Sequence, residues 1–189
     1  MNRWIATSIA LLLTPWLCST GLAGEAASPL PSGSVYQLEV ALTNQDGRAH
    51  GLDVYRGHPV LITMFYGSCP AACPLIIDTL RATEKALPAA QRAGLRVLMI
   101  SIDPERDSVA ALRDLATQRR IDTGRWTLAR ASAEEVRTIA ALFNIQYRAL
   151  PDGQFNHSSI ITLLSPQGEI EASSARLGTA DPVLVSQLR

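Results

Sequence analysis

Cysteine is scarce in this chain, which has three among 189 residues. A chain of this length can bury a core large enough to fold without disulfides, so its cysteines are not needed as structural cross-links. An excess of charge of one sign is also missing, because 17 lysines and arginines balance 17 aspartates and glutamates and no basic tract is present. This balance excludes the electrostatic footprint of a nucleic-acid-binding protein.

The N-terminal segment is almost uncharged, with Arg3 as the only charged residue before Glu25. An apolar centre followed by the small-residue end Gly21–Ala23 is typical of an export signal cleaved after Ala23. The apolar span also approaches the roughly 20 residues that cross a bilayer, so an uncleaved membrane anchor is the alternative. We expect an exported, periplasmic protein, either soluble or tethered to the inner membrane. The predicted organisation is a signal peptide or anchor at residues 1–23, a flexible lead-in at 24–34 and one domain at 35–189.

Cleavage removes Cys18 and leaves only Cys69 and Cys73, which lie in the stretch YGSCPAACP. This stretch directly follows the apolar run Val60–Phe65, where a buried strand gives way to a helix. Proline is favoured at the first helical position, so Pro74 predicts that Cys73 is the N-cap. The positive end of a helix stabilises a thiolate, and we therefore expect lowered thiol pKa values. Such thiols serve redox exchange and metal binding equally well.

The order of the predicted elements indicates an α/β fold, a thioredoxin-like sandwich with an N-terminal hairpin and a helical insertion. In that fold the loop after the first central strand carries the cysteine pair. The N-terminal hairpin is predicted from Tyr36–Leu42 and Gly51–Tyr55, on either side of a turn-rich segment. The other predicted strands are Val60–Tyr66, Leu95–Ile102, Ser158–Leu164 and Glu169–Ser173, and the predicted helices are Leu75–Leu87, Ser108–Gln118, one capped by Ser132 and Glu135, and one beginning at Asp181.

His157 is the third candidate ligand. It is predicted to open the strand HSSIITLL, antiparallel to Val60–Tyr66, so its side chain is expected at the sheet edge where the cysteines lie. Closed structural zinc sites need four ligands, whereas two thiolates and one imidazole suit Cu(I), and the imidazole also allows Cu(II). We therefore expect one copper ion per domain. His50 and His58 are expected to be ordinary loop histidines.

Three separated blocks resemble the Sco/SenC family of copper-binding assembly proteins. They are FYGSCPAACP around the cysteines, ISIDPERDS at residues 100–108 and FNHSSIITLLSPQGEI at 155–170. By position, the resemblance assigns the copper ligands to Cys69, Cys73 and His157. It also implies a role for Asp103 as an outer residue of the site or a partner contact. Ala71 and Ala72 stand between the cysteines, where many members carry a polar or acidic residue.

The resemblance implies a thioredoxin-like, exported or tethered copper metallochaperone. Such a protein helps to build the dinuclear copper A site in subunit II of cytochrome c oxidase, by delivering copper, by reducing the cysteines of that site, or by both. Subunit II is the expected partner, together with a periplasmic copper donor or thiol reductant. Nucleic acid is excluded, and membrane contact is expected only through an uncleaved N-terminal anchor.

Three other functions remain as alternatives. An exported thiol-disulfide oxidoreductase would use Cys69 and Cys73 as its redox pair, although its usual spacing has two intervening residues rather than three. A peroxidase would need a threonine three residues before the reactive cysteine, where this chain has Tyr66. A copper or redox sensor would use the same ligands as a carrier. The pattern therefore favours a carrier over an enzyme and leaves thiol reductase activity open.

Overall fold

The structure is a computed structural model that describes residues 29–70 and 72–188. The predicted signal segment, with Cys18, lies outside the described residues. The strands are β1 (Leu42–Asn44), β2 (Ala49–His50), β3 (Val60–Phe65), β4 (Arg96–Ser101), β5 (Trp126–Arg130), β6 (Tyr147–Ala149), β7 (Phe155–His157), β8 (Ile161–Leu164) and β9 (Ile170–Ser174). The helices are η1 (Val35–Gln37), η2 (Asp53–Tyr55), α1 (Ala72–Lys85), α2 (Ala89–Gly94), α3 (Val109–Gln118), α4 (Ala133–Leu142) and α5 (Pro182–Gln187). Across these described ranges, no helix combines the length and the apolarity needed to span a bilayer.

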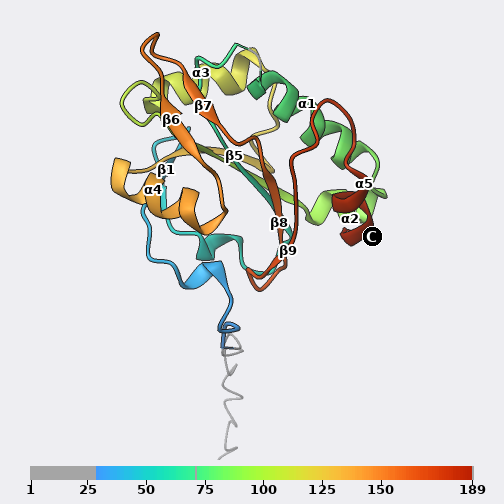
Figure 1. Ribbon diagram of the computed structural model, residues 1–189. Coiled ribbons are helices and arrows are strands. Elements are labelled where there is room, and N and C mark those ends of the chain that lie inside the picture. Colours follow the sequence, from blue (N-terminus) through green and yellow to red (C-terminus); the bar gives the residue numbers. More distant parts are fainter. Residues whose placement is uncertain (1–28, 71, 189) are drawn as a thin grey trace, which may run out of the picture.

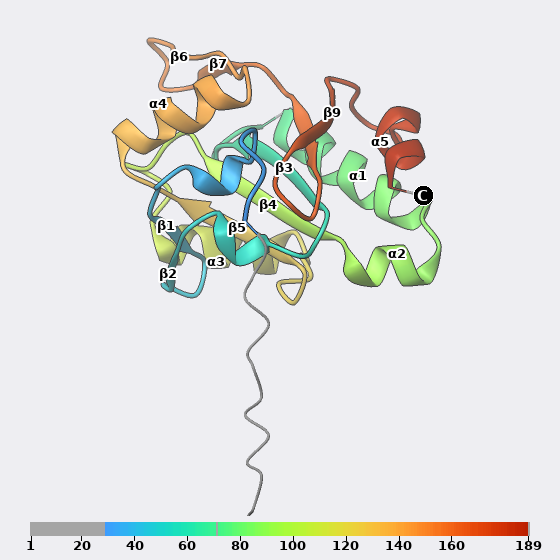
Figure 2. The same cartoon turned by 90° about the horizontal axis from the view of Figure 1, so that it is seen from below.

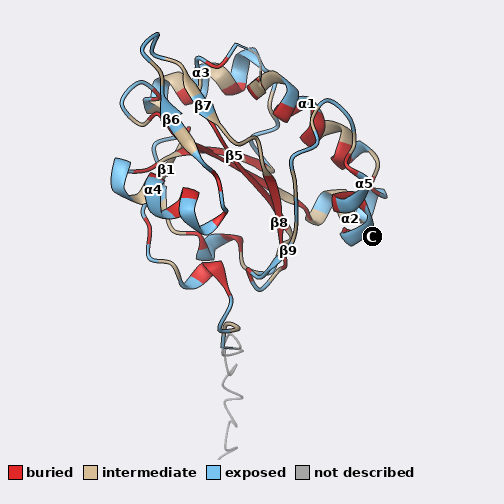
Figure 3. Cartoon of the chain, in the orientation of Figure 1, coloured by how far each residue is buried: buried red, intermediate tan, exposed pale blue. Residues whose placement is uncertain are grey.

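A seven-stranded sheet in the order β2-β1-β5-β4-β3-β8-β9 forms the centre of the domain. The run VLITMF forms β3, and all six of its residues are buried because helices cover both faces of the sheet. β4 pairs with β3 in parallel, whereas β8 pairs with β3 antiparallel, with Val60 opposite Leu164. The predicted α/β, thioredoxin-like fold is therefore confirmed, and Figure 3 shows β3, β4 and β5 as its buried centre.

The helices form layers on the two faces of this sheet. α1, α3 and α5 lie along one face, and α4 lies on the other (Figure 1). The predicted capping box begins α4, since the Ser132 hydroxyl accepts a hydrogen bond from the Glu135 amide and the Glu135 carboxylate accepts one from the Ser132 amide. Glu135 also accepts a hydrogen bond from the Ala41 amide at 2.6 Å, which connects the helical insertion to the N-terminal segment.

The N-terminal hairpin is tighter than predicted. β1 begins at Leu42, the last residue of the first predicted strand, β2 lies within the stretch expected to be the turn, and parts of the two predicted strands form the short helices η1 and η2. The reason is local, because the Asn44 side-chain oxygen accepts hydrogen bonds from the amides of Asp46 and Arg48 and closes a tight turn. β1 also pairs with β5, a strand that the sequence analysis did not predict.

The described end of the predicted lead-in lies against the domain. Ser34 is buried, accepts a hydrogen bond from the Tyr36 amide and donates one to the carbonyl of Gln167 at 2.5 Å. Leu30 packs against the hydrophobic core. The last residues before position 35 are thus placed by contacts with the turn between β8 and β9.

Strand directions bring three segments to one edge of the sheet. The parallel strands β3 and β4 end there, and the antiparallel strand β8 begins there. The cysteine stretch follows β3, the acidic turn 103–107 follows β4, and the segment that contains His157 precedes β8. Any site built from these segments must lie at this edge.

Candidate metal centre

The loop after β3 holds both cysteines through its backbone. The Cys69 amide donates a hydrogen bond to the Tyr66 carbonyl at 3.2 Å, which turns the chain back toward the sheet. The Cys73 amide donates to the Cys69 sulfur at 3.4 Å. α1 begins at Ala72, so the prediction that Cys73 is the N-cap is wrong, and Cys73 lies in the first turn of the helix. The sulfur of Cys69 thus accepts a hydrogen bond from one of the backbone amides that the side chain of an N-cap residue would otherwise accept.

Both cysteines are in the thiol form and buried, with exposed fractions of 7% for Cys69 and 6% for Cys73. Burial raises the pKa of the Cys73 thiol, and the neighbouring Cys69 and Asp107 raise it further. A hydrogen bond from Cys73 Sγ to the Tyr66 carbonyl, at 3.5 Å, accompanies this burial. The expected lowering of this pKa is therefore wrong for the metal-free protein, because desolvation outweighs the effect of the helix terminus. A coordinating metal deprotonates a thiol outright, so a raised pKa does not prevent ligation.

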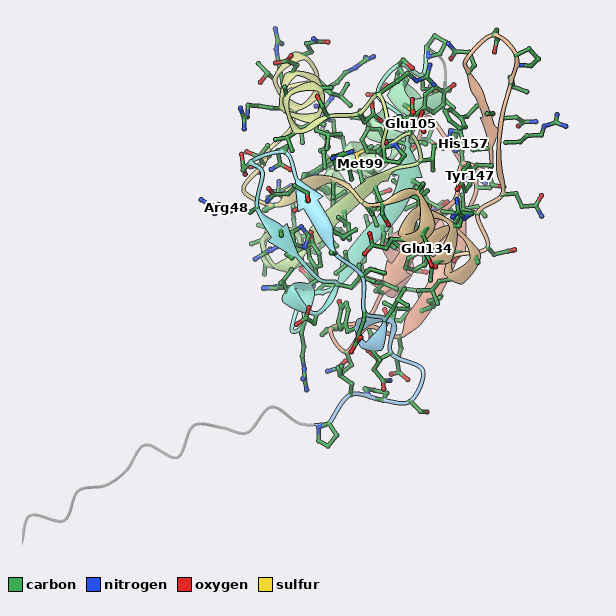
Figure 4. All side chains as sticks on the ribbon, turned by 90° about the vertical axis from the view of Figure 1, so that its left-hand side faces the viewer. Arg48, Met99, Glu105, Glu134, Tyr147 and His157 are labelled. Carbon is green, nitrogen blue, oxygen red and sulfur yellow. The ribbon has the colours of Figure 1, made fainter. Side chains whose placement is uncertain are left out.

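His157 lies in a different element from the one predicted. It ends β7, which pairs with β6 in a separate two-stranded sheet, and β8 begins only at Ile161. The prediction that His157 opens the long strand is thus wrong, because His157 belongs to a separate, shorter strand that comes before it. The expected outcome still holds, since the β6–β7 hairpin brings the imidazole to the cysteine edge. In Figure 4, His157 lies beside Tyr147, its partner across the hairpin, at the far side of the molecule from Arg48.

The hydrogen bonding of His157 leaves one ring nitrogen suited to a metal. Nδ1 lies 3.2 Å from the Ser158 carbonyl, and since a carbonyl can only accept, Nδ1 is the donor. Within the described part of the chain, Nε2 is buried without a hydrogen-bond partner. Burial lowers the pKa of the imidazole, so the neutral form is favoured. The residue therefore presents an unpaired lone pair in a buried position.

The three side chains lie together as the sequence analysis anticipated. One ligand atom each from Cys69, Cys73 and His157 falls within 4.8 Å of the others. Two sulfurs each about 2.3 Å from a common ion lie at most about 4.6 Å apart, so the observed spacing is close to what one ion can bridge. Two thiols and an imidazole form a soft, three-atom donor set, which fits a copper site better than a closed zinc site.

Aromatic rings form the wall between the cysteines and the hairpin. The Tyr66 ring packs edge-on against His157, with centroids 5.8 Å apart, and against Phe155 at 5.3 Å. The Tyr66 hydroxyl donates a hydrogen bond to the Gln154 side-chain oxygen at 2.9 Å. A pocket of about 310 Å³ opens beside Cys69 and His157, and these same aromatic residues line it. A small partner surface could approach the sulfur and imidazole from this side.

Two acidic residues follow β4, and the structure gives them different contacts. Asp103 is buried and pairs with the guanidinium of Arg106, and it is not one of the three clustered ligand residues. Its predicted role at the site stays a prediction. Asp107, just before the predicted helix Ser108–Gln118, is buried and accepts a hydrogen bond from the Gly67 amide at 2.9 Å. Burial raises the pKa of the Asp107 carboxyl.

Gly67 lies in close contact with that carboxylate. A Cβ placed at position 67 would lie 2.5 Å from Asp107 Oδ1, so a side chain there would displace the acid or the loop. The Ser101 hydroxyl also donates to Asp107. Asp107 thus fixes the start of the cysteine loop from 40 residues away. The signal that could have indicated this was an acidic residue shortly after a buried strand, at the same sheet edge as the cysteines.

The remaining histidines have the ordinary roles predicted for them. His50 Nδ1 lies 2.9 Å from the Gly51 carbonyl, and His58 Nδ1 lies 3.1 Å from the Gly94 carbonyl. His50 Nε2, like that of His157, is buried without a hydrogen-bond partner among the described residues, but His50 is not grouped with the cysteines. His58 precedes β3 and the cysteines follow it, so His58 and the cysteines lie at opposite ends of this strand. These histidines do not contribute to the three-residue cluster.

Comparison with known proteins matches the SCO1/SenC family model to residues 31–186. The curated "Protein SCO2 homolog, mitochondrial" of Bos taurus is 29% identical over 172 residues, which cover 85% of this chain and 61% of that protein. The chain thus spans about three fifths of the length of this relative.

Solved structures show the same fold. Arabidopsis thaliana ScoI, crystallised with copper bound, superposes with a TM-score of 0.70 at 20% identity, covering 79% of this chain and 93% of that one. BsSco, described as having a disulfide switch and as a member of the Sco family of cytochrome c oxidase assembly proteins, superposes with a TM-score of 0.63 at 23% identity, covering 78% and 88%. Because the family model spans most of the chain, the protein belongs to the SCO1/SenC family.

Proposed function

We propose that this protein is a copper metallochaperone that binds one copper ion through Cys69, Cys73 and His157. The observation that carries the proposal is the grouping of three ligand atoms within 4.8 Å, one of them from an imidazole whose buried Nε2 lacks a partner. An unpaired polar atom in a buried position costs free energy, and a bound ion would supply the missing partner.

The residues of the site have distinct parts in this function. Cys69 and Cys73 bind the ion as thiolates and release their protons to solvent. The hydrogen bond from Nδ1 of His157 to the Ser158 carbonyl orients the ring so that Nε2 can bind. Two thiolates are sufficient for soft Cu(I), while the imidazole makes Cu(II) acceptable as well.

Copper titration of the reduced mature domain under anaerobic conditions tests the binding proposal. We expect one copper per domain, loss of tight binding of both Cu(I) and Cu(II) in Cys69→Ser and Cys73→Ser, and loss of tight Cu(II) binding in His157→Ala. His58→Ala is the matched control, because His58 is a partly buried histidine at the other end of β3. One-to-one binding of unchanged affinity in all three site variants would contradict the proposal.

The recipient we propose is the dinuclear copper A site of cytochrome c oxidase subunit II. Membership of the SCO1/SenC family, together with the description of BsSco as one of a family of oxidase assembly proteins, supports this choice. It requires an exported protein, in agreement with the predicted signal segment at residues 1–23. A transfer assay from the copper-loaded domain to an isolated, soluble fragment of subunit II separates delivery from sensing, since a sensor would retain its copper.

A second function, reduction of the recipient's cysteines, is favoured by the form of the pair. Cys69 and Cys73 form a dithiol pair whose sulfurs lie within 4.8 Å of each other, and Cys69 lies outside the helix. Attack by one thiolate on a disulfide of the recipient, followed by the second, would oxidise this pair to a disulfide and reduce the recipient by two electrons. His157→Ala separates the functions, because it should abolish Cu(II) binding and transfer and leave thiol-disulfide exchange intact.

A further inference from the structure

The β6–β7 hairpin, residues 147–157, carries the imidazole of the site but is not part of the central sheet. Its strands form a two-stranded sheet in which Tyr147 pairs with His157 and Ala149 with Phe155. Figures 1 and 2 place this hairpin at the rim of the domain. An isolated two-stranded hairpin is marginally stable in water, so its contacts with the body of the domain determine where His157 lies.

The turn at residues 103–107 contacts both ligand-bearing segments. On one side, Asp107 accepts the hydrogen bond from the Gly67 amide in the cysteine loop. On the other side, the guanidinium of Arg106 donates a hydrogen bond to the Gly153 carbonyl at the tip of the hairpin. This short turn therefore connects the segment with two sulfurs to the segment with the imidazole.

Arg106 contacts the hairpin in two ways. Besides the hydrogen bond to Gly153, its guanidinium carbon lies 5.6 Å from the centre of the Phe155 ring, within the range of a cation–π interaction. Its Nε pairs with the buried carboxylate of Asp103, and this ion pair helps to hold the guanidinium in place. Gly153 has a left-handed φ of 79°, and a Cβ there would lie only 3.3 Å from the guanidinium, so glycine permits the close approach.

Phe155 relays this contact to His157. The two residues are separated by one position on β7 and therefore point to the same face of the strand. On that face both rings pack against Tyr66, which leads into the cysteine loop. Holding Phe155 in place consequently holds His157 beside the cysteines.

We propose that Arg106 is a positioning residue that keeps the β6–β7 hairpin closed over the cysteine pair and thereby keeps the imidazole within reach of the bound ion. This inference rests on the proposed copper function, since it concerns the third ligand of that site. An exposed ion pair alone contributes little, and half of the Arg106 side chain is solvent-exposed. The proposed effect comes instead from the carbonyl and the ring that Arg106 contacts on the hairpin.

The proposal predicts unequal effects on the two copper states. Opening of the hairpin withdraws His157 and leaves Cys69 and Cys73 in place. Cu(I) can stay bound to two thiolates, whereas Cu(II) depends more on the imidazole. Loss of the Arg106 contacts should therefore weaken Cu(II) binding more than Cu(I) binding.

The test compares Arg106→Ala and Arg106→Lys with Arg113→Ala, which removes an exposed arginine from α3. In the metal-free proteins, hydrogen exchange of the amides of residues 147–157 reports hairpin opening. We expect Arg106→Ala to accelerate it about tenfold, equivalent to about 1.4 kcal/mol, with melting temperature and exchange in β3 and β4 nearly unchanged. Arg106→Lys retains the charge near Phe155 but not the planar fork, so an intermediate effect is expected. Arg113→Ala should match the wild type.

In the copper-loaded proteins, Arg106→Ala should lower Cu(II) affinity about tenfold and alter the thiolate-to-Cu(II) absorption band, while Cu(I) affinity changes less than about threefold. Wild-type hairpin exchange together with an unchanged Cu(II) spectrum in Arg106→Ala would overturn the proposal, as would equal losses of Cu(I) and Cu(II). If Arg106→Ala fails to fold, the same criteria apply to Arg106→Lys. Failure of the wild-type protein to bind copper would refute the proposed function, while the metal-free exchange comparison would still decide the role of Arg106.

Discussion

The two segments that form the candidate site are built differently. The cysteine loop lies between the buried strand β3 and helix α1, and Asp107 fixes its first amide. The β6–β7 hairpin is hydrogen-bonded as a separate two-stranded sheet and is held to the domain through Tyr66 and Arg106. The sulfurs are thus part of the core of the domain, whereas the imidazole is attached at its rim.

This difference suits the proposed function, in which the site has to both hold and release an ion. A site in which every ligand is rigidly fixed binds tightly but has no way to lose one ligand at a time. Under the proposed function, the two thiols would provide a stable base that holds the ion in place and the imidazole would leave first, because moving it requires opening of a short hairpin rather than disruption of the core. Variants of the cysteine loop should therefore weaken the binding of both Cu(I) and Cu(II), whereas variants of the hairpin should mainly weaken the binding of Cu(II).

The largest effect is expected from the fixed segment. Cys73→Ser removes a sulfur from a buried position and should lower the affinity for both Cu(I) and Cu(II) by well over the roughly 10- to 100-fold that changes around a metal site typically cost. Competition titration with a chelator of known affinity measures this loss. A Cys73→Ser protein that retains Cu(I) while losing only Cu(II) would reverse the assignment of the stable base to the cysteine segment.

A smaller effect is expected when the support of the cysteine loop is removed. Asp107→Ala leaves the Gly67 amide and the Ser101 hydroxyl without their acceptor, which should cost about 1–3 kcal/mol of unfolding free energy. Copper affinity should fall about tenfold in both oxidation states, because both sulfurs depend on this loop. Asp114→Ala, which removes an exposed carboxylate from α3, is the control. Thermal melting measures the loss of stability, and chelator competition measures the fall in copper affinity. Loss of Cu(II) binding alone in Asp107→Ala would count against the idea that Asp107 positions both sulfurs.

The rigid segment was the easier one to predict from sequence. The apolar run Val60–Phe65 and the strands predicted at Ser158–Leu164 and Glu169–Ser173 are local patterns, and β3 and the β8–β9 hairpin agree with them. The capping box of α4 was equally local. The strand directions that follow from this fold were enough to place His157 at the correct edge of the sheet.

The attached segment and its connections were not predictable in the same way. β6 and β7 have only three residues each, too few to show a clear alternation of apolar and polar residues. The hairpin was therefore not predicted, and His157 was assigned to the following strand. The contact between Asp107 and Gly67 spans 40 positions, and an acidic residue shortly after a buried strand does not by itself identify its partner. The direction of the Cys73 pKa shift depends on burial, which is a property of the folded domain and not of the helix start on which the prediction rested.

The attached imidazole should also produce a modest dependence of stability on pH. Burial lowers the pKa of His157 below its ordinary value of about 6.5, so the unfolded chain binds a proton more readily than the folded one. The neutral imidazole of His157 therefore makes its whole contribution to the free energy of unfolding of the metal-free protein above about pH 6.5. This contribution is lost as the pH falls toward the lowered pKa. Denaturant titrations between about pH 7.5 and 5.5 should show a steeper loss for the wild type than for His157→Gln. Parallel curves would mean that His157 is solvated and that the hairpin is open in solution.

The smallest effect is expected at the opposite end of β3. His58 is partly buried like His157, but its Nδ1 lies 3.1 Å from the Gly94 carbonyl and its Nε2 lies 3.4 Å from the Arg96 guanidinium, so both of its ring nitrogens have partners. His58→Ala should leave the affinity for both copper states unchanged and cost at most about 1 kcal/mol of unfolding free energy through the lost hydrogen bonds. Because the buried Nε2 of His50 also lacks a partner in the described part of the chain, an unpaired nitrogen alone does not mark a ligand. Chelator competition and thermal melting of His58→Ala, measured beside His157→Ala, test whether a position beside the two thiols distinguishes a ligand from an ordinary histidine. A loss of copper in His58→Ala equal to that in His157→Ala would show that a position beside the thiols is not the deciding feature.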